Sequence, residues 1–138
     1  MSSFLPPNAG GLLPYFLLLQ STLAIGHSII CYTGNPDAAM KQFSGPLKPT
    51  PQHTGLSARL YGLKNIYTGL IRGYAAYNIT NPQVYALAQA SFVGVLFLYM
   101  TELFVYKTAR VKECMFPFVG AGGLTLWMWL QKDFYLPA

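Results

Sequence analysis

The sequence predicts an all-α, polytopic membrane protein with four transmembrane helices in one bundle. Two features of the composition favour this fold class: charged residues make up only 9% of the chain, and hydrophobic residues make up 53%. Because a soluble domain carries about 25% charged residues, this chain has too little charge to cover a surface in water. The third feature is a set of four apolar stretches, each close to the length of about 20 residues that a helix needs to cross a membrane.

The four apolar stretches lie between polar or proline-rich breaks in a single domain, residues 1–138. The first stretch ends at Thr33-Gly34-Asn35-Pro36, and the third begins just after Asn81-Pro82. The fourth is short and rich in glycine. Because backbone polar groups in hydrocarbon must be satisfied within their own segment, we expect each stretch to be a helix. The expected spans are residues 12–32, 56–79, 84–106 and 115–130, with a proline-rich loop at residues 33–55 that cannot be helical throughout.

Charges in the loops predict the orientation of the bundle. The loops at residues 33–55 and 107–114 hold five basic residues, whereas the termini and the turn between the second and third spans hold only Lys132. The positive-inside rule therefore places these two loops in the cytoplasm and both termini on the lumenal side. Asn78 begins a glycosylation sequon on that side, but it adjoins the membrane, so we expect it to stay unmodified. The net charge of +5 fits anionic lipid better than nucleic acid, because no basic run with aromatics is present.

Three ionisable residues lie at a similar depth near the predicted cytoplasmic side, namely His27, Arg59 and Glu102. A charged side chain at the bilayer centre costs about 3 kcal/mol or more, so such residues normally face the interior of a bundle. We interpret these three as one polar layer, in which Arg59 and Glu102 pair and fix the helix register, with His27 as a neighbour. The alternative is an acid–base or substrate-anchoring site.

Two other basic residues lie in the second span. Arg72 lies deeper, near the lumenal face, and we expect it to reach toward lumenal headgroups or a polar atom of another helix. Lys64 is expected to extend to the cytoplasmic interface. At roughly 100° per residue, Arg59, Lys64 and Arg72 point in three directions, so they form no single aqueous stripe. This argues against a channel or a transporter.

Small residues in the second and third spans predict close packing between helices. In the second span they are Gly62, Gly69, Gly73 and Ala76, and in the third span they are Ala86, Ala90 and Gly94. Ridges of this kind let helix backbones approach closely, within one subunit or between two. We expect them to pack helices within the subunit first. Because they offer more surface than four short spans need, we also expect a homo-oligomer, most simply a dimer.

The sequence contains no recognisable catalytic or metal-binding motif. It has no HExxH, CxxC or GxSxG pattern, and two histidines are too few for a multi-histidine iron centre. Cys31 and Cys114 cannot form a disulfide framework, so we expect both to be reduced and packed among apolar groups. We therefore expect a protein that is not an enzyme and holds neither a cofactor nor a metal.

Short motifs occur in a characteristic order from residue 56 to residue 135. They are Leu56-Ser57-Ala58-Arg59, Arg72 with Tyr74, Asn81-Pro82, Glu102-Leu103 leading to Lys107-Thr108, and Trp127-Met128-Trp129 followed by Gln131-Lys132-Asp133-Phe134-Tyr135. Their order and spacing in a chain of 138 residues resemble the ergosterol biosynthetic protein 28 family. Lys64 does not belong to that pattern, so it takes no role from the resemblance.

The resemblance implies a non-catalytic protein of the endoplasmic reticulum membrane that acts as a scaffold for sterol C-4 demethylation. The implied partners are the C-4 methyl sterol oxidase, the C-4 decarboxylating 3-hydroxysteroid dehydrogenase, the 3-keto sterol reductase and, in fungi, the sterol C-24 methyltransferase. A tether of this kind would raise the effective concentration of successive enzymes. The alternative is a small four-span membrane enzyme for a lipophilic substrate, of the sterol isomerase or glutathione-dependent type, because such enzymes also place Arg and Glu inside short bundles.

Overall fold

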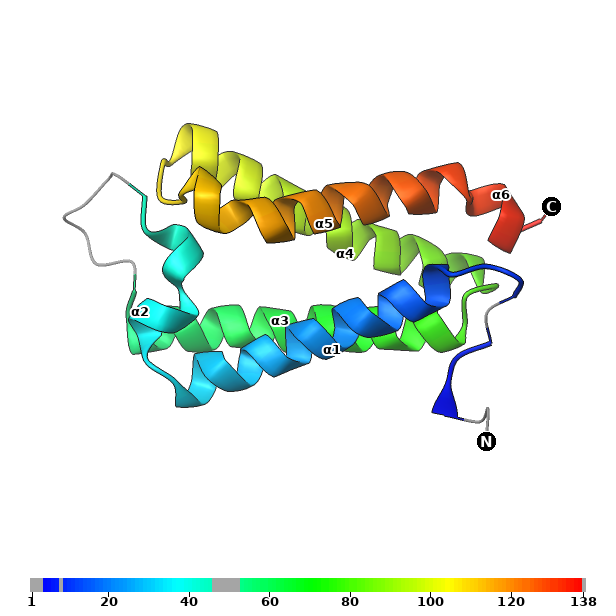
Figure 1. Ribbon diagram of the computed structural model, residues 1–138, viewed down its shortest axis with the longest axis horizontal. Coiled ribbons are helices and arrows are strands. Elements are labelled where there is room, and N and C mark those ends of the chain that lie inside the picture. The colour runs from blue at the N-terminus through cyan, green and yellow to red at the C-terminus, as the bar shows by residue number, and fades with distance from the viewer. Residues whose placement is uncertain (1–3, 8, 46–52, 138) are drawn as a thin grey trace.

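The computed structural model describes residues 4–7, 9–45 and 53–137, and these residues form helices and connections without any strand. The all-α class is therefore confirmed. Four long helices run alongside one another (Figure 1): α1 (Leu13–Thr33), α3 (Gly55–Tyr77), α4 (Pro82–Met100) and α5 (Val111–Leu130). The short elements are α2 (Pro36–Ala39), the 3-10 turn η2 (Lys41–Phe43), the π turn η3 (Thr101–Val105) and α6 (Lys132–Tyr135).

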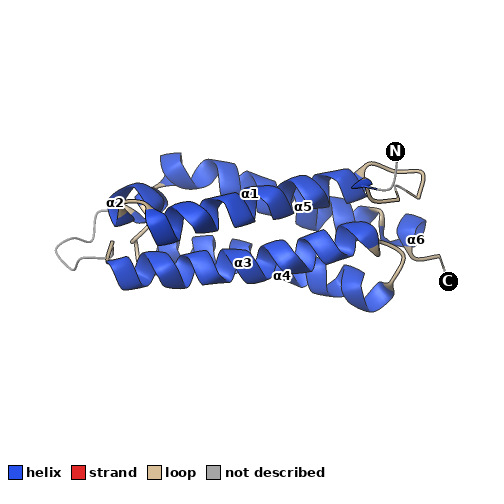
Figure 2. Cartoon of the chain, turned by 90° about the horizontal axis from the view of Figure 1, so that it is seen from below, coloured by secondary structure: helices blue, strands red, loops and turns tan. Residues whose placement is uncertain are grey.

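The four long helices occupy the corners of a square. Seen in two perpendicular views, α1 packs beside α3, α3 beside α4, and α4 beside α5 (Figures 1 and 2). The contact between α1 and α3 is the most extensive of the three. Both termini lie at one end of the bundle, and α2 and the connection from α4 to α5 lie at the other end (Figure 1). The chain therefore passes up and down the bundle four times.

Side-chain caps set the starts of two helices. The hydroxyl of Thr54 accepts a hydrogen bond from the Ser57 backbone N–H (3.0 Å), and the Ser57 hydroxyl accepts one from the Thr54 N–H (3.0 Å), which is a capping box at the start of α3. Asn81 accepts hydrogen bonds from the backbone of Gln83 and Val84, and Pro82 takes the first position of α4. The third helix thus begins two residues before the predicted start of 84.

The third predicted span is not one regular helix up to residue 106. After Met100 the chain forms the π turn η3, in which the Tyr106 N–H donates to the carbonyl of Thr101 (2.9 Å). Lys107 then has a φ of 55°, and the carbonyl of Glu102 accepts from the backbone of Thr108 and Ala109. A π turn holds one more residue than an α turn, so it rotates the residues within and after it relative to α4. The fourth helix starts at Val111, four residues before the predicted 115.

Glycines on one face of α3 allow α1 to approach closely. A Cβ atom would lie 2.8 Å from the Cys31 Cβ if built on Gly62, 2.7 Å from the Ile25 Cγ1 if built on Gly69, and 2.8 Å from the Ser21 Oγ if built on Gly73. The Ser21 hydroxyl also donates to the Gly69 carbonyl at 2.6 Å. The small face of the second predicted span therefore packs within the subunit, against α1.

The small residues of α4 lie elsewhere. Ala86, Ala90 and Gly94 are exposed, and nothing lies within 4 Å of a Cβ built on Gly94. The residues that α4 buries in the core are instead larger on average, namely Tyr85, Ala88, Phe92, Val95 and Tyr99. The two ridges of small residues therefore do not face each other in the subunit. Ala76, the last residue of the ridge on α3, is fully buried.

Aromatic residues close the end of the bundle where the termini lie. Tyr135 of α6 is 1% exposed, and its hydroxyl accepts a hydrogen bond from the Leu13 backbone N–H at the start of α1 (3.2 Å). Tyr85 of α4, also 1% exposed, donates to the carbonyl of Met128 in α5 (2.5 Å). Short α6 therefore ties the end of α5 to α1.

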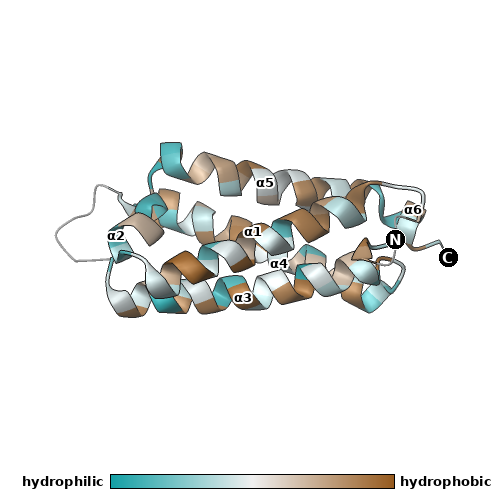
Figure 3. Cartoon of the chain, turned by 60° about the horizontal axis from the view of Figure 1, so that its bottom comes forward, coloured by the Kyte–Doolittle hydropathy of each residue, from teal (hydrophilic) through white to brown (hydrophobic). Residues whose placement is uncertain are grey.

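Two helical segments within the described residues are long and apolar enough to cross a membrane, Leu13–Thr33 and Pro82–Val105. These correspond to the first and third predicted spans. The helix α3 carries three basic residues and does not meet the same criterion, nor does α5. Figure 3 shows apolar residues along the lengths of the long helices. Large apolar side chains such as Phe97 and Phe116 are at least 70% exposed, which indicates a surface that needs an apolar cover.

The packing of α1 on α3 predicts opposite effects for two glycines of this helix pair. Gly62→Ala should lower the free energy of unfolding by about 1–3 kcal/mol, because its Cβ would overlap the Cβ of Cys31. Gly26→Ala in α1 is the matched control, because open space surrounds that position and alanine favours a helix. Thermal melts of the purified protein in mild detergent measure both. Equal melting temperatures for the two variants would contradict this packing.

Candidate functional site

A cavity of about 350 Å³ lies in the centre of the bundle, and we call it the central cavity. All four long helices contribute to its wall, together with Gln42 of η2. Its wall is mostly apolar, with a limited set of polar side chains. Cavities of this size and composition are typical of sites for small molecules. The central cavity is therefore the candidate site.

The face of α3 toward the cavity carries more of the polar groups than any other helix does. Tyr61, Lys64, Asn65 and Arg72 all line it and recur at intervals that place them on one side of a helix. This face adjoins the glycine face that contacts α1. Tyr61 and Asn65 were not among the predicted site residues, although this spacing in the sequence would have identified them.

His27 of α1 joins the polar group on α3. Its Nδ1 lies 2.9 Å from the Asn65 amide nitrogen, and the Cys31 sulfur lies 3.8 Å from the same ring nitrogen. The ring also meets Tyr61 edge-on, with 5.7 Å between the centroids. Because an amide nitrogen only donates, His27 Nδ1 acts as the acceptor, and this arrangement favours the neutral ring. His27 is therefore bonded to Asn65 rather than to either of its predicted neighbours.

An aromatic cluster closes the cavity at the end near α2. The hydroxyls of Tyr61 and Tyr99 lie 2.7 Å apart, and Phe43 stacks on the ring of Tyr99 with 6° between the planes. Phe43 also meets Tyr61 edge-on at 5.4 Å. It belongs to η2 and is 8% exposed. The segment from α2 to η2 thus covers one end of the cavity.

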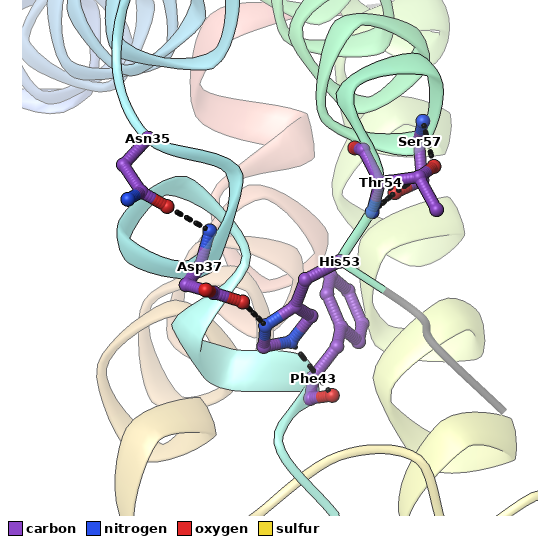
Figure 4. Close-up of polar contacts among 6 residues, drawn as sticks. All are labelled: Asn35, Asp37, Phe43, His53, Thr54 and Ser57. Atoms are coloured by element: carbon purple, nitrogen blue, oxygen red, sulfur yellow. Dashed lines mark hydrogen bonds and ion pairs between the residues drawn. The ribbon is translucent and has the colours of Figure 1, made fainter. Parts of the chain in front are cut away.

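Polar contacts hold this covering segment against the start of α3 (Figure 4). His53 pairs with Asp37 through Nδ1 (3.0 Å), and its Nε2 lies 3.1 Å from the Phe43 carbonyl oxygen. Asn35 caps α2 by accepting from the Asp37 N–H (2.8 Å). The His53 ring therefore fixes the position of Phe43 over the cavity.

Arg72 is buried, with 6% of its surface exposed. Its Nε donates to the hydroxyl of Ser91 (3.0 Å) and its Nη2 to the Ser91 carbonyl (3.2 Å), while the guanidinium lies 3.9 Å from the centre of the Phe92 ring. Arg72 was predicted to reach either toward lumenal headgroups or toward a polar atom of another helix. The structure shows the second arrangement. Such a contact between α3 and α4 is both hydrogen-bonded and cation–π.

Lys64 also points into the bundle. Its Nζ lies 4.1 Å from the centre of the Tyr61 ring, and the residue lines the central cavity together with Arg72. The Lys64 side chain therefore runs along the cavity wall toward the end of the bundle near α2, and its predicted position at the membrane interface stays a prediction. Eight residues of a helix separate Lys64 and Arg72 by about 80°, but both side chains are long and reach the same cavity.

The structure does not bring Arg59 and Glu102 together. Arg59 is exposed, and its guanidinium lies beside Gly55 of its own helix. Glu102 accepts a hydrogen bond from the hydroxyl of Thr108 instead. In the described part of the chain, the predicted polar layer of His27, Arg59 and Glu102 does not form. The π turn is the physical reason, because it places Glu102 in the connection to α5 rather than on the regular face of α4.

Glu113 of α5 is the carboxylate of the cavity wall, and sequence reasoning missed it. Glu113 forms an ion pair with Arg110, whose Nε lies 3.6 Å from the Glu113 Oε2. The same oxygen is buried and accepts no hydrogen bond within the described residues. Glu113 thus lies at the cavity edge, held by a long ion pair with a residue outside the cavity wall.

Other predicted features have plain structural positions. Cys31 and Cys114 are buried and free, as expected. Asn78 ends α3, and its side-chain amide donates to the Tyr74 carbonyl (2.9 Å). Among the residues that the structure describes, no three His, Cys, Asp or Glu side chains gather closely enough to hold a metal ion.

The sequence matches the family model described as Erg28 like protein over residues 13–126, from α1 into α5. The chain belongs to this family. Ergosterol biosynthetic protein 28 of Candida albicans is 33% identical over 97% of this chain and 95% of its own length. The protein of the same name from Saccharomyces cerevisiae is 31% identical over 91% of this chain and 83% of its own, and a human homolog is 30% identical over 68% and 65%. No solved structure gives a significant match.

Membership of the Erg28 family confirms the resemblance that the short motifs indicated. The matched region includes every helix that lines the central cavity. The relatives carry the name of a biosynthetic pathway and are not named as enzymes.

The tyrosine pair in the cavity predicts a measurable coupling. Tyr61→Phe and Tyr99→Phe should each lower the free energy of unfolding by about 1 kcal/mol, because each leaves the other buried hydroxyl without this partner. The double variant should cost less than the sum of the two. Tyr74→Phe is the control, because Tyr74 is 63% exposed on the same helix. Strictly additive losses in thermal or denaturant unfolding would rule out this hydrogen bond.

Proposed function

We propose that this chain is a non-catalytic membrane scaffold of sterol biosynthesis, which holds the enzymes of sterol C-4 demethylation together in the endoplasmic reticulum membrane. The observation that carries the proposal is membership of the Erg28 family over residues 13–126. Fungal relatives that align with almost the whole chain are named ergosterol biosynthetic proteins. The proposed partners are the C-4 methyl sterol oxidase, the C-4 decarboxylating 3-hydroxysteroid dehydrogenase, the 3-keto sterol reductase and the sterol C-24 methyltransferase.

The proposal includes four membrane spans. The helices α1, α3 and α5 contain 21, 23 and 20 residues, so each is about 30 Å long, like the hydrocarbon core of a bilayer. Two apolar segments meet the criterion for a span, and α3 and α5 pack alongside them. If α1 and α4 cross the bilayer, their neighbours of equal length cross it too. Because Arg72 and Lys64 of α3 face the cavity, the polar groups of this helix are compatible with that position.

The basic residues at one end support the proposed orientation. Lys41, Lys107, Arg110 and Lys112 are all exposed and belong to the connections at the end opposite the termini. Anionic lipid on the cytoplasmic leaflet attracts such residues. This end therefore faces the cytoplasm in our proposal, and the termini face the lumen.

Most of the surface available to partner enzymes lies along the helices. The connection from α3 to α4 is only residues 78–81, and α2 and η2 in the connection from α1 to α3 pack against the long helices, so little of the described chain projects from the bundle. A scaffold of this shape would meet its clients mainly within the bilayer, through exposed residues such as Phe97 of α4 and Phe116 of α5. Holding successive enzymes side by side shortens the path of a poorly soluble intermediate.

A second candidate function is a small membrane enzyme for a lipophilic substrate. The polar lining of the central cavity favours it, because His27, Tyr61 and Tyr99 are groups that can transfer protons. The two candidates differ in whether the isolated protein turns over a substrate.

Complementation in yeast tests the scaffold role. Expressed in a Saccharomyces cerevisiae strain that lacks its own ergosterol biosynthetic protein 28, a tagged form of this chain should restore ergosterol and reduce C-4 methylated sterols, measured by gas chromatography and mass spectrometry. The C-4 demethylation enzymes should co-purify with the tag from mild detergent. Purified protein alone should leave a C-4 methylated sterol unchanged. Turnover by the isolated protein would refute the non-catalytic scaffold and establish the enzyme.

The proposal also includes a homodimer, and the exposed small residues of α4 supply its interface. Ala86, Ala90 and Gly94 leave a surface on which a second helix could approach closely. Gly94→Leu should therefore convert the dimer to a monomer in mild detergent, measured by size-exclusion chromatography with light scattering. Gly123→Leu in α5 is the matched control, because open space also surrounds that glycine. A wild-type monomer, or a dimer that survives Gly94→Leu, would exclude this interface.

A further inference from the structure

The central cavity contains two cationic side chains that have no acidic partner. Among the described residues, no carboxylate lies within ion-pair distance of Arg72 or Lys64. Glu113 is the one carboxylate in the described wall, and its ion pair is with Arg110. Buried charges in proteins are normally paired, because an isolated charge in apolar surroundings is costly. Lys64 and Arg72 therefore lack an acidic partner of their own, although the wall also carries the Glu113 carboxylate.

Both cations keep hydrogen-bond donors that the protein does not use. The Nε and Nη2 of Arg72 donate to Ser91, so Nη1 has no hydrogen-bond partner in the described part of the chain. The Lys64 ammonium lies over the Tyr61 ring and makes no hydrogen bond with a described residue. An ammonium has three donors and a guanidinium has five. These free donors are the groups that bind the oxygens of an acid.

The remainder of the wall is suited to an apolar body. Leu23 of α1, Phe92 and Val95 of α4, and Phe116 and Ala121 of α5 line the same space. A small hydrated anion would gain nothing from these side chains. A molecule with one acid group and an apolar skeleton would satisfy both parts of the wall.

The cavity is closed at its ends and opens between helices. Phe43 and the tyrosine pair close the end near α2, and the buried core residues Leu17 and Leu124 fill the bundle toward the termini. At the side, Gln20 of α1 faces Gly120 of α5 from two helices that are not a closely packed pair, and Phe116 of the same wall is 76% exposed. A ligand would therefore enter sideways, through the surface that faces lipid in the proposed bundle.

We propose that the central cavity binds an anionic lipid, with its carboxylate or phosphate on Lys64 and Arg72 and its apolar body against Phe92 and Val95. This site requires the bundle to be intact, but it does not require the chain to act as a scaffold. The acid group replaces the missing partner of the two cations, and the lipid fills a cavity of about 350 Å³. Three sources share this chemistry: a steroid acid, a fatty acid and an acidic phospholipid.

Direct binding to the purified full-length protein tests the proposal. Native mass spectrometry from dodecyl maltoside would follow four probes: 3β-hydroxy-5-cholenic acid, its methyl ester, oleic acid and dioleoyl phosphatidic acid. At least one acid should bind saturably, at one molecule per subunit. The steroid acid, if it is the ligand, should bind at least tenfold more tightly than its uncharged ester. The acid with the lowest Kd identifies the source.

Variants of the cations separate the site from a general effect of charge. Lys64→Gln and Arg72→Gln should each weaken binding of the acid at least tenfold and leave binding of the ester unchanged. Arg59→Gln is the matched control, because it removes the same charge from an exposed position of the same helix. If Arg72→Gln does not give a folded protein, Lys64→Gln decides the result.

Filling the cavity tests the position of the apolar body. Gly120→Leu adds a side chain to the cavity wall and should weaken binding of acid and ester alike, whereas Gly123→Leu lies outside that wall and should change neither. Equal losses for Lys64→Gln and Arg59→Gln, or no saturable binding of any acid, would overturn the proposal. Where the steroid acid binds, an equal affinity for its ester would overturn it as well. Because these measurements use isolated protein, they are independent of the test of the scaffold role. Ligand binding can be absent while complementation in yeast succeeds, and ligand binding can be present while complementation fails.

Discussion

The close approach of α1 to α3 determines where the other helices can lie. Three glycines on α3 remove the side chains that would separate the two backbones, and the hydroxyl of Ser21 donates to the carbonyl of Gly69 across the contact. In an apolar surrounding, packing and hydrogen bonds of this kind replace the hydrophobic effect as the force that joins helices. Because the glycine face of α3 packs against α1, the neighbouring polar face of α3 lies toward the cavity that α4 and α5 also line.

The central cavity is a consequence of this unequal packing. The tight side of the square is α1 with α3, whereas α4 and α5 meet the pair through larger side chains, such as Phe92 and Tyr99. Arg72 spans the space to Ser91 of α4, and η2 covers one end with Phe43. The result is a cavity whose polar groups are densest along α3, with fewer on the other helices, inside a bundle with an apolar exterior.

The helices were predictable because long apolar stretches of the sequence end at polar or proline-rich breaks, and all four predicted helices occur within a few residues of their expected limits. The polar layer was not predictable by the same means. The depth of a residue along a helix follows from its number, but the direction of its side chain can be calculated only if every turn is a regular α turn. The π turn at Thr101–Val105 is not, so the direction calculated for Glu102, toward Arg59, does not hold. The direction of Lys64 was not predictable for another reason: Tyr61, one turn earlier on α3, offers its ammonium a cation–π contact that residue spacing alone does not reveal.

A scaffold that worked through its outer surface alone would have no need of buried cations. Arg72 could be replaced by an apolar residue of similar volume without loss of the outer surface, and replacing buried charges in this way often leaves a protein equally or more stable. Lys64 is only half-buried, but it lines the same cavity and lies outside the motifs that indicate the family. The two residues are better explained by something that occupies the cavity than by the stability of the bundle. An anionic lipid in that position would make the packing of α4 and α5 on the α1–α3 pair depend on its presence, and through those two helices it would also alter the exposed surface that includes Phe97 and Phe116.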